Sequence, residues 1–350
     1  MNIAIPTAKT AREHRRTLAS VFLDQGGLLE RVAARMSELA GNRATDTGAQ
    51  MVHEHLETGG KRLRASLALS ACHALGGRAE HAVDWAAAVE LLHNASLVHD
   101  DIQDGDRMRR GKAALWARYG SAQAISAGDL LLMLPFRALG RYPATQQAAL
   151  VQILAEYAER TVRGQIREHA LTASLGGDWG TYFGAVSGKT GTLFALPVRG
   201  AAELAGVSTD DASDLAQAFS SIGVLYQLQD DLLDLFDAKE RGSKGSDIYA
   251  GRLTAVVLTH LDLHPTDSDE VLAILGKARD QTTAREVAQI TDRFVEGGAA
   301  RQLLDRTERL ASDLLAADSL RGAPGIRAVA QELVHRVLAP LDIVKGAVRE

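Results

Sequence analysis

The stretch LLHNASLVHDDIQDGDRMRRG, residues 91–111, places three aspartates at the end of an apolar helical run and two arginines just beyond it. A second stretch, GVLYQLQDDLLD at residues 223–234, ends on the same spacing of aspartates. The sequence thus holds two DDxxD clusters, formed by Asp100, Asp101 and Asp104 and by Asp230, Asp231 and Asp234. We interpret the rest of the chain as a scaffold that turns the two clusters toward each other.

The spacing within each cluster indicates a bound cation. A helix turns by about 100° per residue, so Asp100 and Asp104 share one face, with Asp101 at its edge and His93 two turns earlier on the same face. Like charges at this spacing destabilise a bare helix. Oxygen ligands without thiolates favour Mg²⁺, whose shell is usually completed by water and substrate phosphates. The second cluster repeats the pattern, with Gly223, Gln227, Asp230 and Asp234 on one face.

A single DDxxD is often only a solvated acidic helix end. Here, however, both clusters follow apolar runs, AAAVELLHNASLVH and FSSIGVLYQL. A wholly exposed helix would not carry such runs. Two copies in this setting therefore favour a pair of metal-binding clusters over two solvated helix ends.

Composition limits the class of protein. Long segments with the 3.6-residue period recur, aromatic residues make up 5%, and alternating strand patterns are scarce, so we predict an all-α fold. The net charge of −5 gives no basic excess for nucleic acid. The only cysteine, Cys72, excludes an intrachain disulfide and fits a cytoplasmic location. No apolar run approaches the roughly 20 residues that span a bilayer.

The N-terminus carries basic residues without a following apolar core, which argues against a secretory signal. We predict a tail and the start of the first helix over residues 1–25, and one helical domain over residues 26–350. The polar, glycine-rich segment ERGSKGSDIYAGRLT, residues 240–254, is predicted to be a loop that covers the site.

Two basic segments suit a diphosphate. In GGKRLR, residues 59–64, Gly59 and Gly60 allow backbone amides to approach an anion, and Lys61 and Arg64 add charge. The alternative for this segment is a helix end followed by a solvated basic turn. In SGKTGTLF, residues 187–194, Lys189 lies between glycines without the spacing of a Walker A loop. This pattern predicts a bend inside a helix, with Lys189 directed inward.

Taken in order, these motifs resemble the trans-isoprenyl diphosphate synthases, or polyprenyl synthetases. GGKRLR is similar to the family's GGKRxRP, LVHDDIQD with RRG to its first aspartate-rich motif, Lys189-Thr190 to its KT, and YQLQDDLLD to its FQxxDD motif. The match runs over about 200 residues. The resemblance implies a single-domain, isoprenoid-synthase-type helical bundle with a central cavity between the two DDxxD helices.

The resemblance also implies a role for each motif residue. Catalysis would rest on Asp100, Asp101, Asp104, Lys189, Asp230 and Asp231, with three Mg²⁺ ions held by Asp100, Asp101, Asp104, Asp230 and Asp234. The allylic diphosphate would be bound with help from Arg109, Lys189, Thr190, Gln227 and Lys244. Isopentenyl diphosphate would lie, without metal, against Gly60, Lys61, Arg64, His93 and Arg110. Family members are commonly homodimers, which we expect here.

The sequence departs from the family pattern in several places. The family proline after GGKRxR is Ala65, and Lys112, Ala113 and Ala114 replace the residues that usually follow RRG. Lys244 has the spacing of a family lysine, but the GSD after it comes two residues early, and the later GK is Gly251-Arg252. No departure removes a predicted metal ligand, so we expect activity.

Residues four and five positions before the first aspartate set product length in this family. These are Ser96 and Ala95, both small. Helical arithmetic puts Ser96 on the carboxylate face and Ala95 to its side. Small residues here favour geranylgeranyl diphosphate (C20), with longer-chain or farnesyl products as the alternatives. A deeper floor for the cavity would come from Leu92, Met133 or Phe136.

Three rival readings remain. A class I terpene cyclase also uses DDxxD, but it usually carries an NSE-type second motif and needs no isopentenyl site. A non-catalytic partner subunit tends to lose aspartates, whereas all six are present here. A purely structural helical bundle does not account for two matched carboxylate clusters and three basic sites.

Overall fold

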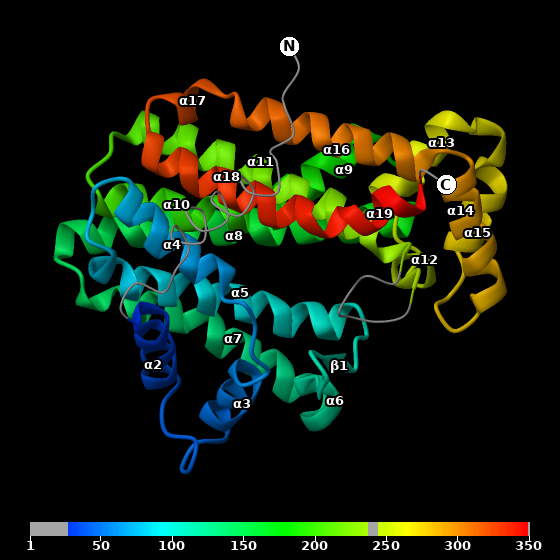
Figure 1. The fold of residues 1–350 in the computed structure, drawn as a ribbon. Helices are drawn as coiled ribbons and strands as arrows, with labels where there is room; N and C mark the ends of the chain where they lie inside the picture. The colour runs from blue at the N-terminus through cyan, green and yellow to red at the C-terminus, as the bar shows by residue number, and fades with distance from the viewer. Residues whose placement is uncertain (1–26, 237–243, 349–350) are drawn as a thin grey trace.

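The protein is a bundle of helices (Figure 1), seen in a computed structural model that describes residues 27–236 and 244–348. The predicted N-terminal tail and residues 240–243 of the predicted covering loop lie outside this part. The helices run in the order α2 (Leu28–Ala40), α3 (Thr47–Leu56), α4 (Leu63–Ala74), α5 (Val83–Gln103), α6 (Leu115–Tyr119), α7 (Ser121–Ala138), α8 (Ala144–Ser174), α9 (Trp179–Val186), α10 (Thr192–Leu204), α11 (Thr209–Asp234), α12 (Ser246–Tyr249), α13 (Ala255–Leu263), α14 (Ser268–Leu275), α15 (Ala284–Glu296), α16 (Ala299–Leu315), α17 (Asp318–Arg321), α18 (Pro324–Leu338) and α19 (Asp342–Ala347).

The predicted all-α class is confirmed. In the described ranges the only sheet is a small antiparallel pair, β1 (Met108–Arg109) with β2 (Lys112–Ala113). The turn between the strands consists of Arg110 and Gly111, whose φ angles are 51° and 77°. Two successive positive φ angles are what a tight two-residue hairpin requires. The RRG motif therefore folds back on itself just after α5.

Helix α5 is buried on nearly all sides, which explains its apolar sequence. Trp85, Ala87 and Leu91 are fully buried, and α7 and α10 pack along the helix. Each fully buried leucine contributes roughly 1.5–3 kcal/mol relative to an exposed one. Helix α10 also packs against α4, α8 and α11, so it connects the helices that carry the two aspartate clusters (Figure 1).

The segment from α9 to α10 is one continuous helix with a widened π turn at Ser187–Gly191. Glycines allow its neighbours to approach closely. Gly164 of α8 lies against the backbone of Gly188 and Lys189, and Gly223 of α11 lies against Gly191. The predicted glycine-flanked bend inside a helix is thus present, and π turns often occur at functional sites.

A second core lies beside the first, among α11, α13, α15 and α16. It includes Leu232, Val257, Phe294 and Leu303, all at most 1% exposed. The prediction of a loop over residues 240–254 was wrong in part, because Ser246–Tyr249 form α12. Among the described residues, no helix is long and apolar enough to cross a membrane.

Candidate active site

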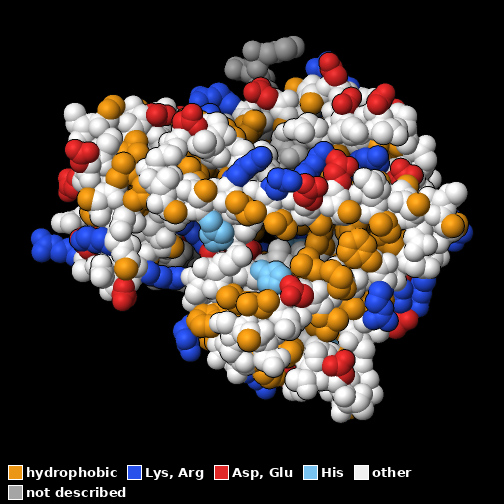
Figure 2. Space-filling model, turned by 180° about the vertical axis from the view of Figure 1, so that it is seen from behind, with side chains coloured by type: hydrophobic (Ala, Val, Ile, Leu, Met, Phe, Trp, Pro, Cys, Tyr) orange, Lys and Arg blue, Asp and Glu red, His pale blue; other side chains and the backbone are white. Residues whose placement is uncertain are grey.

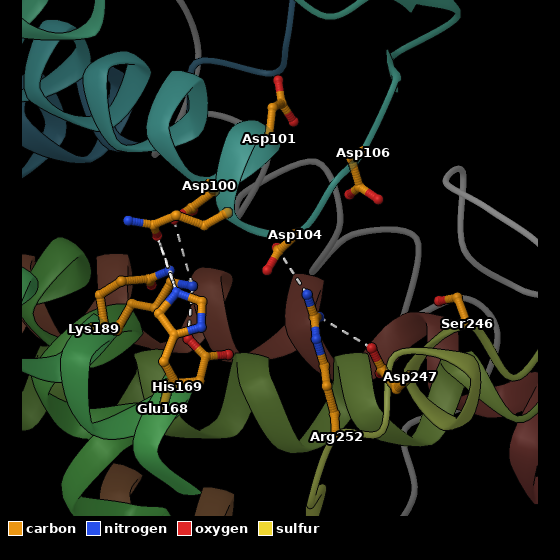
Figure 3. Close-up of polar contacts among 12 residues, drawn as sticks. Asp100, Asp101, Asp104, Asp106, Glu168, His169, Lys189, Ser246, Asp247 and Arg252 are labelled. Atoms are coloured by element: carbon orange, nitrogen blue, oxygen red, sulfur yellow. Dashed lines mark hydrogen bonds and ion pairs between the residues drawn. The ribbon is translucent and has the colours of Figure 1, made fainter. Parts of the chain in front are cut away.

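The first aspartate cluster divides into two groups. Asp100 and Asp104 face the interior of the site, whereas Asp101 points to the other side of α5 (Figure 3). Asp101 is 2% exposed, and its two oxygens accept hydrogen bonds from Arg109 Nε at 2.7 and 2.8 Å. Arg109 is itself buried. The structure therefore does not bring Asp101 together with Asp100 and Asp104. Instead, Asp101 forms a buried ion pair with Arg109.

A basic side chain from across the site meets Asp100. Lys189 Nζ lies 2.7 Å from Glu168 Oε2 and 3.7 Å from Asp100 Oδ1. Burial lowers the pKa of Lys189, but the two carboxylates raise it by more, so that its pKa is above the usual value. The predicted inward direction of Lys189 is therefore present, and the widened turn that carries it places its charge beside α5.

The second basic side chain meets Asp104. Arg252 follows α12, and its guanidinium lies 2.8 Å from Asp104 Oδ2 and 3.1 Å from Asp247 Oδ1. These contacts join the end of α5 to the segment after the second cluster (Figure 3). Arg252 takes the place of the lysine that the family usually carries here.

The second cluster is mostly turned into the protein. Asp231 accepts hydrogen bonds from Tyr182 Oη at 2.7 Å, Gln227 Nε2 at 2.9 Å and the Ala255 amide at 2.8 Å. Burial and the carboxylate of Asp247 raise its pKa to about 7.

Asp234 is also buried, and it accepts hydrogen bonds from Ser246 Oγ at 2.6 Å and from the Asp247 amide at 3.0 Å. The half-buried Asp230 is the most exposed aspartate of the second cluster. Among the described residues, no three acidic, histidine or cysteine side chains converge closely enough to hold a metal. The metal set implied by the resemblance, Asp100, Asp101, Asp104, Asp230 and Asp234, stays a prediction.

The basic segments form a separate group. Arg64 Nη1 lies 3.0 Å from His93 Nε2, and the Arg64 guanidinium stacks over the Phe194 ring at 5.3 Å. Gly60 lies against the Arg110 guanidinium: a Cβ on Gly60 would be 2.5 Å from Arg110 Nη1, so a side chain there would displace the guanidinium. Lys61 is exposed. Arg64 therefore lies beside His93, and Gly60 lies beside Arg110.

A buried carboxylate lies beneath this basic group. Glu90 is 6% exposed, and its Oε2 accepts a hydrogen bond from the Ala65 amide at 3.1 Å. Burial raises the pKa of Glu90, although Arg64 opposes this effect. The family proline at position 65 would have no amide hydrogen to donate, so the departure at Ala65 adds a contact that holds the start of α4.

Some predicted residues lie elsewhere. Lys244 is exposed beside Gly245 and takes no part in the contacts of Asp100 or Asp104. Ala95 is fully buried in the packing of α5, and Ser96 is half-buried and donates to the His93 carbonyl at 2.8 Å. Met133 and Phe136 are 56% and 37% exposed, so within this chain they do not form a floor.

Sequence reasoning gave no role to several side chains of the site. Glu168 binds Lys189, and Asp247 binds Arg252. His169 Nε2 lies 3.0 Å from Gln103 Oε1 and 2.9 Å from Gln165 Nε2, which connects α5 to α8 beside the first cluster. Glu168 and His169 stand four and five residues after Gly164, about one helical turn further along α8, so the glycine crossing is the signal that could have pointed to them.

His55 of α3 adds a pH dependence to the fold. It is 3% exposed, and burial, followed by the charges of Arg109 and Arg110, lowers its pKa to about 3. An unfolded histidine has a pKa of about 6.5. Between these values the unfolded chain takes up a proton that the folded protein does not. The stability contributed by neutral His55 is therefore complete above about pH 6.5 and declines as the pH falls toward 3.

We expect this decline to cost the wild-type protein roughly 2 kcal/mol of unfolding free energy by pH 5. Urea denaturation at pH 7.5 and pH 5.0 measures it. His55→Gln has no titrating group, so its stability difference between the two pH values should be smaller by about the same amount. Equal differences in the two proteins would show that His55 is not held neutral.

Comparisons with known proteins identify the family of this chain. The chain matches the model of the polyprenyl synthetase family over residues 46–293. A short chain isoprenyl diphosphate synthase of Methanothermobacter thermautotrophicus is 33% identical over 246 residues, which cover 69% of this chain and 75% of the relative. A geranylgeranyl diphosphate synthase of Saccharolobus solfataricus is 33% identical over 245 residues, with coverage of 67% and 74%.

Solved structures share the fold. The polyprenyl synthase of Caulobacter crescentus superposes with a TM-score of 0.80 at 24% identity, covering 94% of this chain and 97% of that one. The geranylgeranyl pyrophosphate synthetase of Pyrococcus horikoshii gives a TM-score of 0.78 at 25% identity, covering 93% and 99%. The helical bundle described above is therefore the isoprenyl synthase fold.

The fold and the ordered motifs define an enzyme that transfers prenyl groups. The predicted enzyme class is confirmed. The family match covers well over half of the chain, and with the relatives it shows that the chain belongs to the polyprenyl synthetase family.

Proposed function

We propose that this prenyltransferase condenses isopentenyl diphosphate head-to-tail with an allylic diphosphate and releases geranylgeranyl diphosphate. One observation carries the proposal: the site has two differently charged halves. Carboxylates bridged by Lys189 and Arg252 form one half, and the basic group of Arg64, His93 and Arg110 forms the other. The first half suits a diphosphate bound through metal, and the second suits a diphosphate bound directly.

The charges of the first half fit Mg²⁺. Burial raises the pKa of Asp100, Lys189 lowers it, and the carboxylates of Asp104 and Glu168 raise it again, with a net increase. A divalent cation would relieve this crowding of negative charge. Asp100 and Asp104, with Asp230 of the second cluster, would hold it through hard oxygen ligands. When bound, Mg²⁺ supplies charge stabilisation for the departing pyrophosphate.

The chain's own residues would then act on the substrates. Lys189 would neutralise an oxygen of the allylic diphosphate, and Arg64 and Arg110 would orient the isopentenyl diphosphate. After the allylic carbon–oxygen bond breaks, the isopentenyl double bond attacks the allylic cation, and a proton passes to the released pyrophosphate. Apolar side chains around the reacting carbons would be needed to keep water from the cation.

Two observations support a C20 product. Relatives from Methanosarcina mazei and Saccharolobus solfataricus, each 33% identical, are named geranylgeranyl diphosphate synthases. Ser96 and Ala95, four and five positions before the first aspartate, are also small. A relative named as a farnesyl diphosphate synthase is 30% identical, which keeps a C15 product as the second candidate.

A product assay tests this proposal. Purified enzyme with Mg²⁺ and isopentenyl diphosphate is given dimethylallyl, geranyl or farnesyl diphosphate, and product mass is read. We expect elongation that ends at C20. A C15 product or a series of longer products would support the condensation reaction but reject the proposed C20 chain length. Diphosphate release from an allylic substrate alone would indicate a cyclase, and no turnover of any substrate would indicate a non-catalytic subunit.

We also propose that the enzyme is a homodimer. Five apolar side chains of α7 and α8 are exposed in the single chain: Ile125, Met133, Phe136, Val162 and Ile166, at 37–62% exposure. Figure 2 shows hydrophobic side chains gathering on the face seen from behind. Exposed apolar patches on folded proteins commonly mark association surfaces. A second copy of the chain would cover these residues.

Ile166→Asp should convert the dimer into a monomer, because it would place a carboxylate in the proposed apolar interface. Light scattering coupled to gel filtration gives the mass. Ile343→Asp is the matched control: Ile343 of α19 is 59% exposed, against 62% for Ile166, and lies outside α7 and α8. We expect it to remain a dimer. A wild-type protein that already runs as a monomer at micromolar concentration would reject the proposal.

A further inference from the structure

Arg252 binds the first aspartate cluster from the opposite side of the site. Its two contacts, with Asp104 Oδ2 at 2.8 Å and Asp247 Oδ1 at 3.1 Å, place one positive group between two carboxylates from distant parts of the chain. All three side chains are at most one-third exposed. A lysine ammonium is a single point charge, whereas a guanidinium has several donors in a fixed fork. The arginine at this position therefore suits a bridge between two carboxylates.

The backbone fixes Arg252 in this place. Gly251 has a φ of 66°, and a Cβ on it would lie 2.4 Å from the Leu275 carbonyl oxygen. The Arg252 amide donates to the Asp247 carbonyl at 2.9 Å, and Asp247 is anchored through its own amide to Asp234. Burial lowers the pKa of Arg252, but Asp247 and Asp104 raise it by more, so the side chain stays charged.

We infer that, in the substrate-free enzyme, Arg252 occupies the position of a divalent cation at Asp104 and competes with metal for this carboxylate. The inference rests on the proposed Mg²⁺-dependent function. Metal would bind Asp104 only when the guanidinium moves away. A diphosphate offers the guanidinium a bidentate partner, so diphosphate and metal would enter the site together. Lys244 is exposed and lies outside these contacts, so over the described residues 244–254 it is Arg252 that contacts the Asp104 carboxylate.

A metal-binding measurement tests the competition without relying on turnover. The full-length protein is titrated with Mn²⁺ alone, and free Mn²⁺ is read by its paramagnetic resonance signal. Arg252→Gln removes the competing charge, so we expect Mn²⁺ to bind roughly tenfold more tightly than in the wild type. Arg252→Lys retains a single charge and should fall between the two. It also serves as the second variant if the glutamine variant does not fold, which circular dichroism would show.

The chain offers a matched control. Arg279 contacts the same segment, at the Asp104 carbonyl (3.2 Å) and at Asp106 Oδ1 (3.4 Å), but not the Asp104 carboxylate. Arg279→Gln should therefore leave the Mn²⁺ affinity unchanged. In an Asp104→Asn background, Arg252→Gln should no longer tighten metal binding, because the contested ligand is absent.

The outcomes separate this inference from the proposed function. Equal Mn²⁺ affinity in the wild type and in Arg252→Gln, with binding present in both, would overturn the competition and leave the metal-dependent function standing. An equal gain in Arg279→Gln would show that the effect is a general change of surface charge, which would also overturn it. No Mn²⁺ binding by any variant, with or without inorganic pyrophosphate, would reject the metal itself and the inference with it.

Discussion

Asp100→Asn should lower kcat/KM by about two to three orders of magnitude, because it removes one charged group from the stabilisation of the departing pyrophosphate. The asparagine keeps the shape of the side chain but not its charge. Asp100 lies 3.7 Å from Lys189 and is also affected by the carboxylates of Asp104 and Glu168. Removing a buried negative charge from this crowded group should leave the unfolding free energy equal or slightly higher. The expected loss is therefore confined to activity.

Steady-state kinetics at saturating Mg²⁺ and a urea titration of the same sample separate the two effects. Asp106→Asn is the matched control: Asp106 follows the cluster on the same segment, and its carboxylate contacts the exposed Arg279. We expect this variant to retain most of its activity. Near wild-type kcat/KM in Asp100→Asn would mean that the first cluster does not stabilise the leaving group.

Gly164→Ala should be among the most harmful single substitutions in the chain. A Cβ at this position would lie 2.2 Å from the Lys189 amide nitrogen and 2.4 Å from the Gly188 carbonyl carbon. Both atoms belong to backbone, which cannot rotate away as a side chain can. We expect a loss of roughly 3 kcal/mol in unfolding free energy. Activity should also fall, because the widened turn would be pushed away from Asp100 and Glu168.

Gly184→Ala provides the comparison, since a Cβ there would meet no atom within 4 Å. Gly184 lies in α9, in the same continuous helix as the widened turn. Alanine is the better helix former, so this variant should gain about 0.5–1 kcal/mol. Urea denaturation of both variants measures the two effects. Similar stabilities for Gly164→Ala and the wild type would show that α8 and the turn have more room than the structure indicates.

The helices that carry the motifs can be predicted from the sequence because each contains a long apolar run. The apolar run before Asp100 predicts a helix over residues 81–104, and α5 spans Val83–Gln103. The apolar run FSSIGVLYQL before Asp230 likewise predicts a helix over residues 209–236, and α11 spans Thr209–Asp234. The bend at Lys189 was also predicted, because two glycines flank a lysine and a threonine inside an apolar segment. Local pattern and burial agree in these three elements.

The sequence does not reveal which of the six aspartates face the site and which are held by buried hydrogen bonds. Helical geometry alone gives Asp101 a place at the edge of the metal-binding face, but a hairpin eight residues later supplies Arg109 to hold it. The carboxylates of Asp231 and Asp234 accept hydrogen bonds from backbone amides that lie 24 and 13 residues further along the chain. Such partners depend on tertiary contacts, which spacing within one helix does not reveal.

The segment after α11 shows the same limit. Its glycines and polar residues predict a loop, yet Ser246–Tyr249 form α12, because the anchoring of Asp247 and Ser246 to Asp234 stabilises the start of a helical turn. From the sequence alone, Arg252 shows only that a positive charge is kept where the family pattern has the lysine of its later GK. Its contact with Asp104 joins residues 148 positions apart, and only the folded chain shows it.

The widened turn at Ser187–Gly191 sets the phase between two parts of one helix. Before the turn, Tyr182 faces Asp231, and after it, Phe194 and Leu196 are buried in the first core. Losing one residue from the turn would allow regular α-helical bonding to continue through it and would rotate one part against the other by about 100°. Because packing holds the parts before and after the turn in place, the shortened turn between them would have to absorb this rotation, and Lys189 would point away from α5. A relative with such a single-codon deletion would still show a lysine and a threonine in sequence, while its geometry for binding a diphosphate had been lost.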